Sequence, residues 1–256
     1  MSSQSGATAP GPAILAATLA PLALSATASA PGEPPAGWQP WVIRPDKKKT
    51  RYAVAVQAVD GQERRVLHAA ADSAASGLWV PVDVPAAAAT RISWSWRAGA
   101  LIEGADGSRP EAEDAPVRLV LAFDGDWRRL PLRDQMQAET ARFLTGRDMP
   151  YATLIYTWDA CQPVEAMIPN AYSARIKKKV VESGPSNVGR WRRYERDFAQ
   201  DFIEAFGEPP GRLIGIGVLT DTDNTRTSVQ GWYGDIQLLT AGRRPFGTFA
   251  ERAALD

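Results

Sequence analysis

The stretch RISWSWRA, from Arg91 to Ala98, alternates apolar and polar side chains along its whole length. Successive side chains of a β-strand point to opposite faces, so Ile92, Trp94 and Trp96 would share one face. Serines and arginines would occupy the other face. The pattern predicts a half-buried strand whose two tryptophans fill the core of a β protein.

Further β-type runs occur on both sides of this stretch, and about ten strands are expected in all. They cover residues 51–59, 63–71, 77–84, 117–124, 151–158, 175–183, 212–220 and 231–239. Asp60-Gly61 between the first two runs is a hairpin signal, and the proline of the third run marks an edge strand or a strand end. No regular βαβ alternation is present, which favours antiparallel pairing.

Two segments predict helices. DQMQAETARFLTG (134–146) contains helix-forming residues and ends in a glycine suited to a C-cap. WRRYERDFAQDFIEAFGEPP (191–210) carries aromatic residues at steps of three and four, which predicts an amphipathic helix stopped at Gly207. The expected fold is therefore mainly β: an antiparallel jelly-roll-like β-sandwich with two accessory α-helices.

The chain is expected to contain one folded domain, over residues 41–240. Residues 1–30 carry no charge, and an Ala/Leu run ends there in Ala28-Ser29-Ala30, which indicates a signal peptide and hence a periplasmic or secreted protein. A signal peptide usually carries a Lys or Arg before its apolar run, and this one does not, so the alternative is a disordered leader. Its low hydrophobicity argues against a transmembrane segment. Residues 31–40 read as a Pro/Gly linker, and 241–256 as a C-terminal tail.

Composition excludes several classes of site. Basic and acidic residues balance at 29 each, so no global field favours nucleic acid as a partner. Cys161 is the single cysteine and His68 the single histidine. They exclude an internal disulfide, a zinc-type cysteine pattern and a His-rich metal site. We interpret His68 as a partly exposed strand histidine, and we expect no cofactor apart from a possible calcium ion.

Several ordered motifs together resemble a bacterial family catalogued as domain of unknown function 3047. They include ADSAASGLW, ISWSWR, EDAPVRLVLAFDGD, VVESG and WYGDI, and the resemblance covers about residues 38–239. It implies a bacterial, commonly exported protein, and it implies no activity, substrate or catalytic residue. A looser likeness links the fold to jelly-roll modules that bind carbohydrates, some of which hold calcium beside a final-strand aspartate.

Nine tryptophans raise the possibility of a glycan platform, because sugars stack their C–H faces on exposed aromatic rings. Trp94 and Trp96 are better explained as core residues. The candidates for ligand binding lie near strand ends: Trp79, Trp127, Trp158, Tyr233 and Asp235.

The loop acids have two competing interpretations. A carboxyl pair could catalyse glycoside hydrolysis, with Glu182, Asp124 and Asp114 as candidates, or such acids could simply cap turns and pair with arginines. Hard oxygen ligands suit calcium, for which the candidates are Asp221, Asp223, Asn224 and Asp235. The alternative is a structural Asx turn, which we favour.

Two lysine triplets, Lys47–Lys49 and Lys177–Lys179, could contribute to a basic surface for a uronate-bearing or sulfated polymer, or for anionic lipid headgroups. Strand alternation places Lys178 on the opposite face from its neighbours, and a solvated face is the commoner explanation.

The leading functional hypothesis is a non-catalytic binding module for a cell-envelope glycan or similar ligand. The alternatives are a polysaccharide-acting enzyme with a carboxylate pair and a structural or interaction protein of the envelope.

Overall fold

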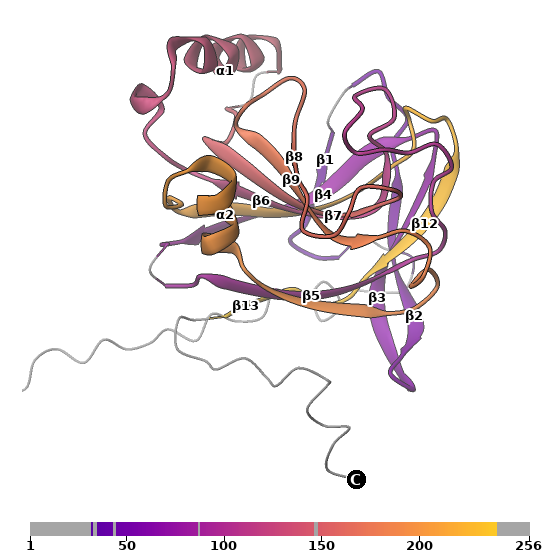
Figure 1. Ribbon diagram of the computed structural model, residues 1–256. Coiled ribbons are helices and arrows are strands. Elements are labelled where there is room, and N and C mark those ends of the chain that lie inside the picture. The colour runs from indigo at the N-terminus through magenta and orange to yellow at the C-terminus, as the bar shows by residue number, and fades with distance from the viewer. Residues whose placement is uncertain (1–31, 33–34, 43–44, 87, 146–147, 240–256) are drawn as a thin grey trace, which may run out of the picture.

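A computed structural model describes residues 32, 35–42, 45–86, 88–145 and 148–239 (Figure 1). The predicted leader and tail lie outside these residues. Within them the strands form two sheets that pack face to face, with two α-helices. The predicted fold class, a mainly β jelly-roll-like sandwich with two accessory helices, is confirmed. No helix in the described part of the chain is long and apolar enough to cross a membrane.

Seven strands form the first sheet, in the order β1-β4-β11-β6-β7-β9-β8. All of its pairs are antiparallel except β7 with β9. In chain order the strands are β1 (Gln39–Trp41), β4 (Ala75–Val84), β6 (Ala115–Phe123), β7 (Ala152–Asp159), β8 (Met167–Pro169), β9 (Ile176–Ser183) and β11 (Leu213–Asp221).

The second sheet has the order β10-β5-β12-β3-β2, and β13 also pairs with β5. Its strands are β2 (Arg51–Val59), β3 (Gln62–Asp72), β5 (Arg91–Ala98), β10 (Arg192–Asp197), β12 (Ser228–Tyr233) and β13 (Gln237–Leu239). Asp60 and Gly61 both have positive φ, 51° and 75°, as a two-residue type I′ hairpin requires. The predicted hairpin is therefore confirmed.

Aromatic side chains fill the space between the sheets. Trp94 and Trp96 are 2% and 0% exposed, which confirms that they are core residues. The Trp94 ring stacks on Tyr156 with centroids 4.9 Å apart. Burying a side chain of this size contributes about 1.5–3 kcal/mol, so this aromatic layer is a main source of stability.

The segment 191–210, predicted as one helix, divides at Asp197. Residues 192–197 form β10, which pairs with β5, and only Phe198–Phe206 form α2. Phe198 and Phe202 are buried, and Figure 1 shows α2 closing one end of the sandwich. The aromatic spacing fitted a helix, but pairing with the edge of β5 holds Trp191 and Tyr194 outside it. The other predicted helix is present as α1 (Leu132–Thr145), and its predicted C-cap, Gly146, lies outside the described residues.

Three further details differ from expectation. β4 is not an edge strand, because β1 pairs with its first half. Its Pro81 lies beyond the residues that pair with β1 and opposite Gly215 of β11. The last predicted strand splits into β12 and β13 around Gly234–Ile236. Residues expected in a linker enter the fold, since Trp38 is buried and β1 begins at Gln39.

Candidate ligand-binding site

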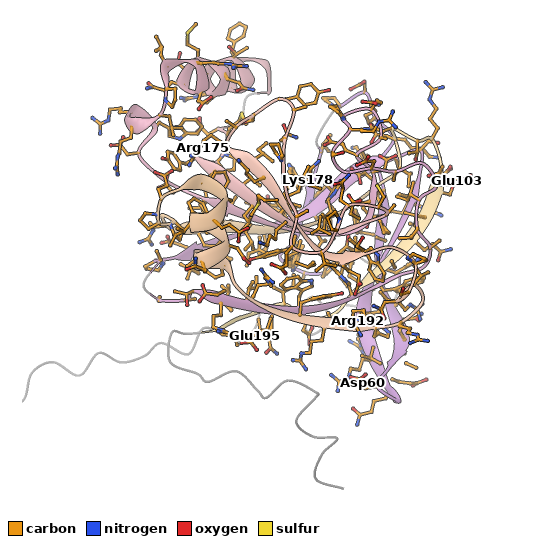
Figure 2. The ribbon with its side chains drawn as sticks, viewed as in Figure 1. Asp60, Glu103, Arg175, Lys178, Arg192 and Glu195 are labelled. Carbon is orange, nitrogen blue, oxygen red and sulfur yellow. The ribbon has the colours of Figure 1, made fainter. Side chains whose placement is uncertain are left out.

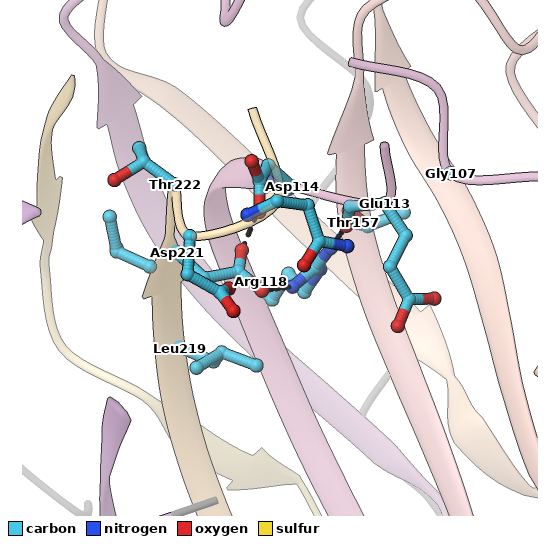
Figure 3. Close-up of polar contacts among 12 residues, drawn as sticks. Gly107, Glu113, Asp114, Arg118, Thr157, Leu219, Asp221 and Thr222 are labelled. Carbon is cyan, nitrogen blue, oxygen red and sulfur yellow. Dashed lines mark hydrogen bonds and ion pairs between the residues drawn. The ribbon is translucent and has the colours of Figure 1, made fainter. Parts of the chain in front are cut away.

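The acids of the β11–β12 loop join a buried charge network (Figure 3). Asp221 ends β11 and lies 2.5 Å from a terminal nitrogen of Arg118 on β6. Its other oxygen accepts the backbone N–H of Ala115 at 2.9 Å. Arg118 also donates to the carbonyl of Glu113. The pair ties the end of β11 to the start of β6.

Asp114 holds the loop itself. Its carboxylate accepts the backbone N–H groups of Asn224 (3.2 Å) and Thr225 (2.7 Å), and the hydroxyl of Thr225 at 2.7 Å. Asn224 donates to the carbonyl of Pro110 at 2.7 Å. These bonds tie the loop to the segment before β6, and the predicted Asx turn stays a prediction.

The calcium candidates are only partly brought together. Oxygens of Asp114, Asp221 and Asp223 lie within 4.8 Å of one another, and Lys47 forms an ion pair with Asp223 at 2.8 Å. Asp235 is not part of this group and lies in the cleft described below. Arg118 and Lys47 already supply positive charge to the cluster, so calcium remains a prediction without further support.

Burial controls protonation in this network. It raises the pKa of Asp221 to about 6, although Arg118 opposes the shift. Burial also lowers the pKa of the Lys178 ammonium, and nearby Arg118 adds to that effect. Lys178 is 3% exposed and donates to the Gly107 carbonyl and Glu113, each at 2.6 Å.

The second lysine triplet does not form a solvated face. Lys178 and Lys179 point to opposite sides of β9, as the alternation predicts, but both are buried. Lys179 forms ion pairs with Glu204 of α2 at 2.7 Å and with Glu165 at 3.2 Å. Buried cations with dedicated carboxylates are structural groups, so these two lysines do not belong to a basic surface.

The three catalytic candidates do not share a cleft. Asp114 and Asp124 flank opposite ends of β6, which are separated by about 30 Å at the rise of a strand. Asp124 is exposed and accepts the N–H of Gly125 at 2.8 Å. Glu182 lies across from Trp158 on β9, on the inner face of the sheet. Asp114 and Asp124 are therefore too far apart for a hydrolytic carboxyl pair, and the Glu182 carboxylate is bonded to Tyr194 and Asn187.

Two of the aromatic candidates are core residues. Trp158 is 0% exposed and donates its indole N–H to the carbonyl of Gly184 at 3.1 Å. Tyr233 is 1% exposed and donates its hydroxyl to the Leu219 carbonyl at 2.7 Å. Neither ring can be reached by a ligand. Trp127 is half-buried against Tyr151, with centroids 5.8 Å apart.

Trp79 lies on the outer face of the seven-stranded sheet. Its indole covers Gly215 and Gly217 of β11, where an added Cβ would lie 1.6 Å and 3.1 Å from the ring. Trp41 lies beside it, with ring centroids 6.1 Å apart. The half-exposed Trp79 ring thus packs on the glycines of β11, with the Trp41 ring beside it.

Asp235 lies in a cleft at one end of the six-stranded sheet, which we call the arginine cleft. Its cavity volume is about 400 Å³. The lining includes Asp60, Arg64 and Arg65 from the β2–β3 hairpin, and Trp191, Arg192 and Arg193 at the start of β10. Figure 2 shows Asp60 at the hairpin tip and Arg192 above it.

The backbones of Gly234 and Ser95 lie close together and form another wall of the arginine cleft. Gly234 donates its N–H to the Ser95 carbonyl at 2.9 Å. A Cβ on Gly234 would lie 2.2 Å from the Ser95 hydroxyl, so a larger residue here would require the Ser95 side chain to move. Asp235 follows directly and is exposed at the cleft.

Glu182 contacts residues next to and within the arginine cleft. It accepts the hydroxyl of Tyr194 at 2.8 Å and an amide proton of Asn187 at 3.2 Å, and it lies 3.4 Å from Nε of Arg192. Burial raises the pKa of the Tyr194 hydroxyl, and the bond to Glu182 adds to that effect. Glu182 is therefore a positioning residue for the first residues of β10.

The cleft is basic, with four arginines against two aspartates. Within the described residues, the side chain of Arg193 has no hydrogen-bond or ion-pair partner. Sequence reasoning missed Trp191, Arg192 and Arg193 because it placed them on a helix. The capping pattern Asp197…Gln200, which places the helix start after Asp197, was the available signal.

These features define a β-sandwich with an arginine-lined cleft on one sheet. The chain belongs to the family described as a protein of unknown function, DUF3047, whose model matches residues 36–237. That result confirms the resemblance noted in the sequence. No curated protein matches the chain.

Solved structures with a similar overall form include carbohydrate-active proteins. A family 11 carbohydrate-binding module from Clostridium thermocellum matches with a TM-score of 0.38 at 10% identity, over 82% of this chain and 91% of that one. Endoglucanase 3 of Trichoderma harzianum matches with a TM-score of 0.37 at 8% identity, over 82% and 100%. The K2 cleaved adhesin domain of Lys-gingipain gives 0.40 at 12%, over 87% and 99%. Similarity at this level leaves function to be argued from the chain's own residues.

Proposed function

We propose that this protein is a non-catalytic binding module for a cell-envelope glycan, and that the arginine cleft holds an acidic sugar unit. The observation that carries this proposal is the lining of the cleft, where four arginines and an indole surround about 400 Å³. That volume lies within the ~300–1,000 Å³ of ordinary ligand pockets.

Guanidinium groups recognise carboxylates well. Their planar fork can donate two parallel hydrogen bonds to one carboxylate. Arg193 has no partner within the described residues and is therefore available for such a contact. Trp191 adds an apolar ring against which a sugar face can pack.

The location of the ligand is part of the proposal. Export rests on the uncharged Ala/Leu leader, whose residues lie outside those that the structure describes. N-terminal sequencing of the mature protein would test it separately, because an intact leader would contradict export.

Titration calorimetry tests the binding itself. The probes are a galacturonate disaccharide and its neutral galactose counterpart, and we expect the acidic one alone to bind. Arg193→Ala should weaken binding about tenfold, the effect of one lost charge-assisted contact. Arg128→Ala removes an arginine that is 91% exposed elsewhere and should leave binding unchanged. Equal heats from both sugars, or equal losses from both variants, would contradict the proposal.

A further inference from the structure

A row of four side chains crosses the outer face of the six-stranded sheet. His68 on β3, Trp232 on β12 and Arg97 on β5 are direct cross-strand neighbours. His68 stacks on Trp232 with centroids 5.1 Å apart and planes at 18°. The Arg97 guanidinium lies 3.9 Å from the Trp232 centroid and 6.0 Å from that of Trp191. We call these four residues the central row.

A second basic cleft lies on the other side of this row. Its cavity volume is about 880 Å³, and its lining includes Lys48, Lys49, Arg51 and Trp232. Lys48 is paired with Asp72, whereas Lys49 has no partner within the described residues. We call this the lysine cleft. Both clefts include residues of β3. The arginine cleft also includes Trp94 and Ser95 of β5, and the lysine cleft Ser228–Gln230 of β12.

The two clefts are close enough for one ligand. Ser228–Gln230 of β12 line the lysine cleft, and Gly234 and Asp235, which follow β12 in the chain, line the arginine cleft. Five residues of extended chain span about 17 Å. Seven basic and three acidic side chains line the two clefts together, although the chain as a whole has no net charge.

We infer that the outer face of the six-stranded sheet binds a linear acidic polysaccharide that runs from the arginine cleft over the central row to the lysine cleft. The inference rests on the proposed function, because it extends the ligand held in the arginine cleft. It adds a second subsite and requires the ligand to be a polymer.

The central row favours a polysaccharide over a single-stranded nucleic acid. Proteins that bind single strands stack successive bases on open aromatic faces. Here His68 and Arg97 approach Trp232 from the strands on its two sides, so both faces of this ring are covered. What remains for a ligand is the Trp191 ring and the arginine and lysine side chains of the two clefts, which suit a sugar polymer with regularly spaced carboxylates.

Binding of a galacturonate length series tests the inference. A disaccharide reaches one cleft only, whereas an octasaccharide reaches both. We expect the octasaccharide to bind at least about tenfold more tightly, because joining two subsites raises the effective concentration at the second. Lys49→Ala/Arg51→Ala should remove this gain and leave the disaccharide affinity unchanged. The matched control is Arg128→Ala/Arg129→Ala, which removes two exposed positive charges and should change neither affinity.

The outcomes separate the inference from the proposed function. Equal affinity for the two lengths, or a gain that survives Lys49→Ala/Arg51→Ala, overturns the inference and leaves the disaccharide site standing. Failure of both lengths to bind overturns both. Tighter binding of a single-stranded oligodeoxynucleotide with the same number of charges would assign the face to nucleic acid and also overturn the inference. Circular dichroism of each variant verifies its fold.

Discussion

Gly215 leaves the space in which the indole of Trp79 lies. A Cβ at this position would be 1.6 Å from the ring, compared with 3.1 Å at Gly217. We expect Gly215→Ala to displace the indole and lower the free energy of unfolding by about 1–3 kcal/mol, the usual cost of overpacking. Gly217→Ala should cost less. Urea denaturation measures both changes.

The coupling between Gly215 and Trp79 can be isolated. If the clash causes the loss, Trp79→Ala/Gly215→Ala should be more stable than the sum of the two single changes predicts. Strict additivity would show instead that the alanine acts on the backbone of β11 alone.

Asp221 makes a pH-dependent contribution to stability. Burial raises its pKa in the folded protein to about 6, against 3.8 for an ordinary aspartate. Between these values the folded state binds a proton that the unfolded state has released, so this group's contribution to the unfolding free energy rises as pH falls. A shift of about two pKa units corresponds to about 3 kcal/mol.

Asp221→Asn removes this titration. The difference in unfolding free energy between the wild-type protein and Asp221→Asn should move in favour of the wild type between about pH 7 and pH 4. Urea denaturation across that range gives the difference directly. A difference that moves in the opposite direction would mean that Arg118 outweighs burial and keeps the carboxylate ionised.

Helix α2 begins where Asp197 caps it. The Asp197 side chain accepts the backbone N–H of Gln200 at 3.1 Å, and Gly207 ends the helix in a left-handed conformation with φ of 73°. Asp197→Ala should cost about 1 kcal/mol of stability, as loss of an N-cap usually does. Asp197→Asn keeps an acceptor oxygen and should retain most of it. If both variants lose equally, the carboxylate charge rather than the cap stabilises α2.

Elements with a strong local pattern could be predicted from the sequence. The alternation of apolar and polar residues predicts β5, and the β-type run before Asp60-Gly61 predicts β2 and the hairpin that follows it. β10 could not be predicted in the same way, because its aromatic residues also fit a helical spacing. Hydrogen bonding to β5, about a hundred residues earlier in the chain, decides between the two conformations. The local sequence pattern carries no information about pairing with a strand so distant in the chain.

The candidate cleft was still less predictable, because it is assembled at the level of the whole molecule. Its arginines come from a hairpin tip and from the start of β10, which are more than a hundred residues apart in the sequence. Asp235 was predicted as a ligand residue and lines the cleft, whereas Trp158 and Tyr233 proved to be core residues. A residue near a strand end can face solvent or the interior, and only the packing of the two sheets determines which.

The distribution of charge gives a prediction that needs no knowledge of the ligand. The chain has a formal net charge of zero at pH 7, yet seven basic and three acidic side chains line the two clefts of one sheet. A concentrated patch acts locally, since charges beyond about 10 Å are screened at ordinary salt. We therefore expect an anionic cation-exchange resin to retain the protein at pH 7 despite its zero net charge.

Two variants with the same change in net charge distinguish the effect of the basic clefts on retention from the effect of the protein's total charge. Arg193→Glu places a negative charge inside the arginine cleft, whereas Arg128→Glu places it on the exposed 3-10 turn Trp127–Arg129. If the face governs adsorption, Arg193→Glu should elute at clearly lower salt than Arg128→Glu. Elution of both at the same salt concentration would show that net charge alone controls retention, and that the basic face does not act as a unit.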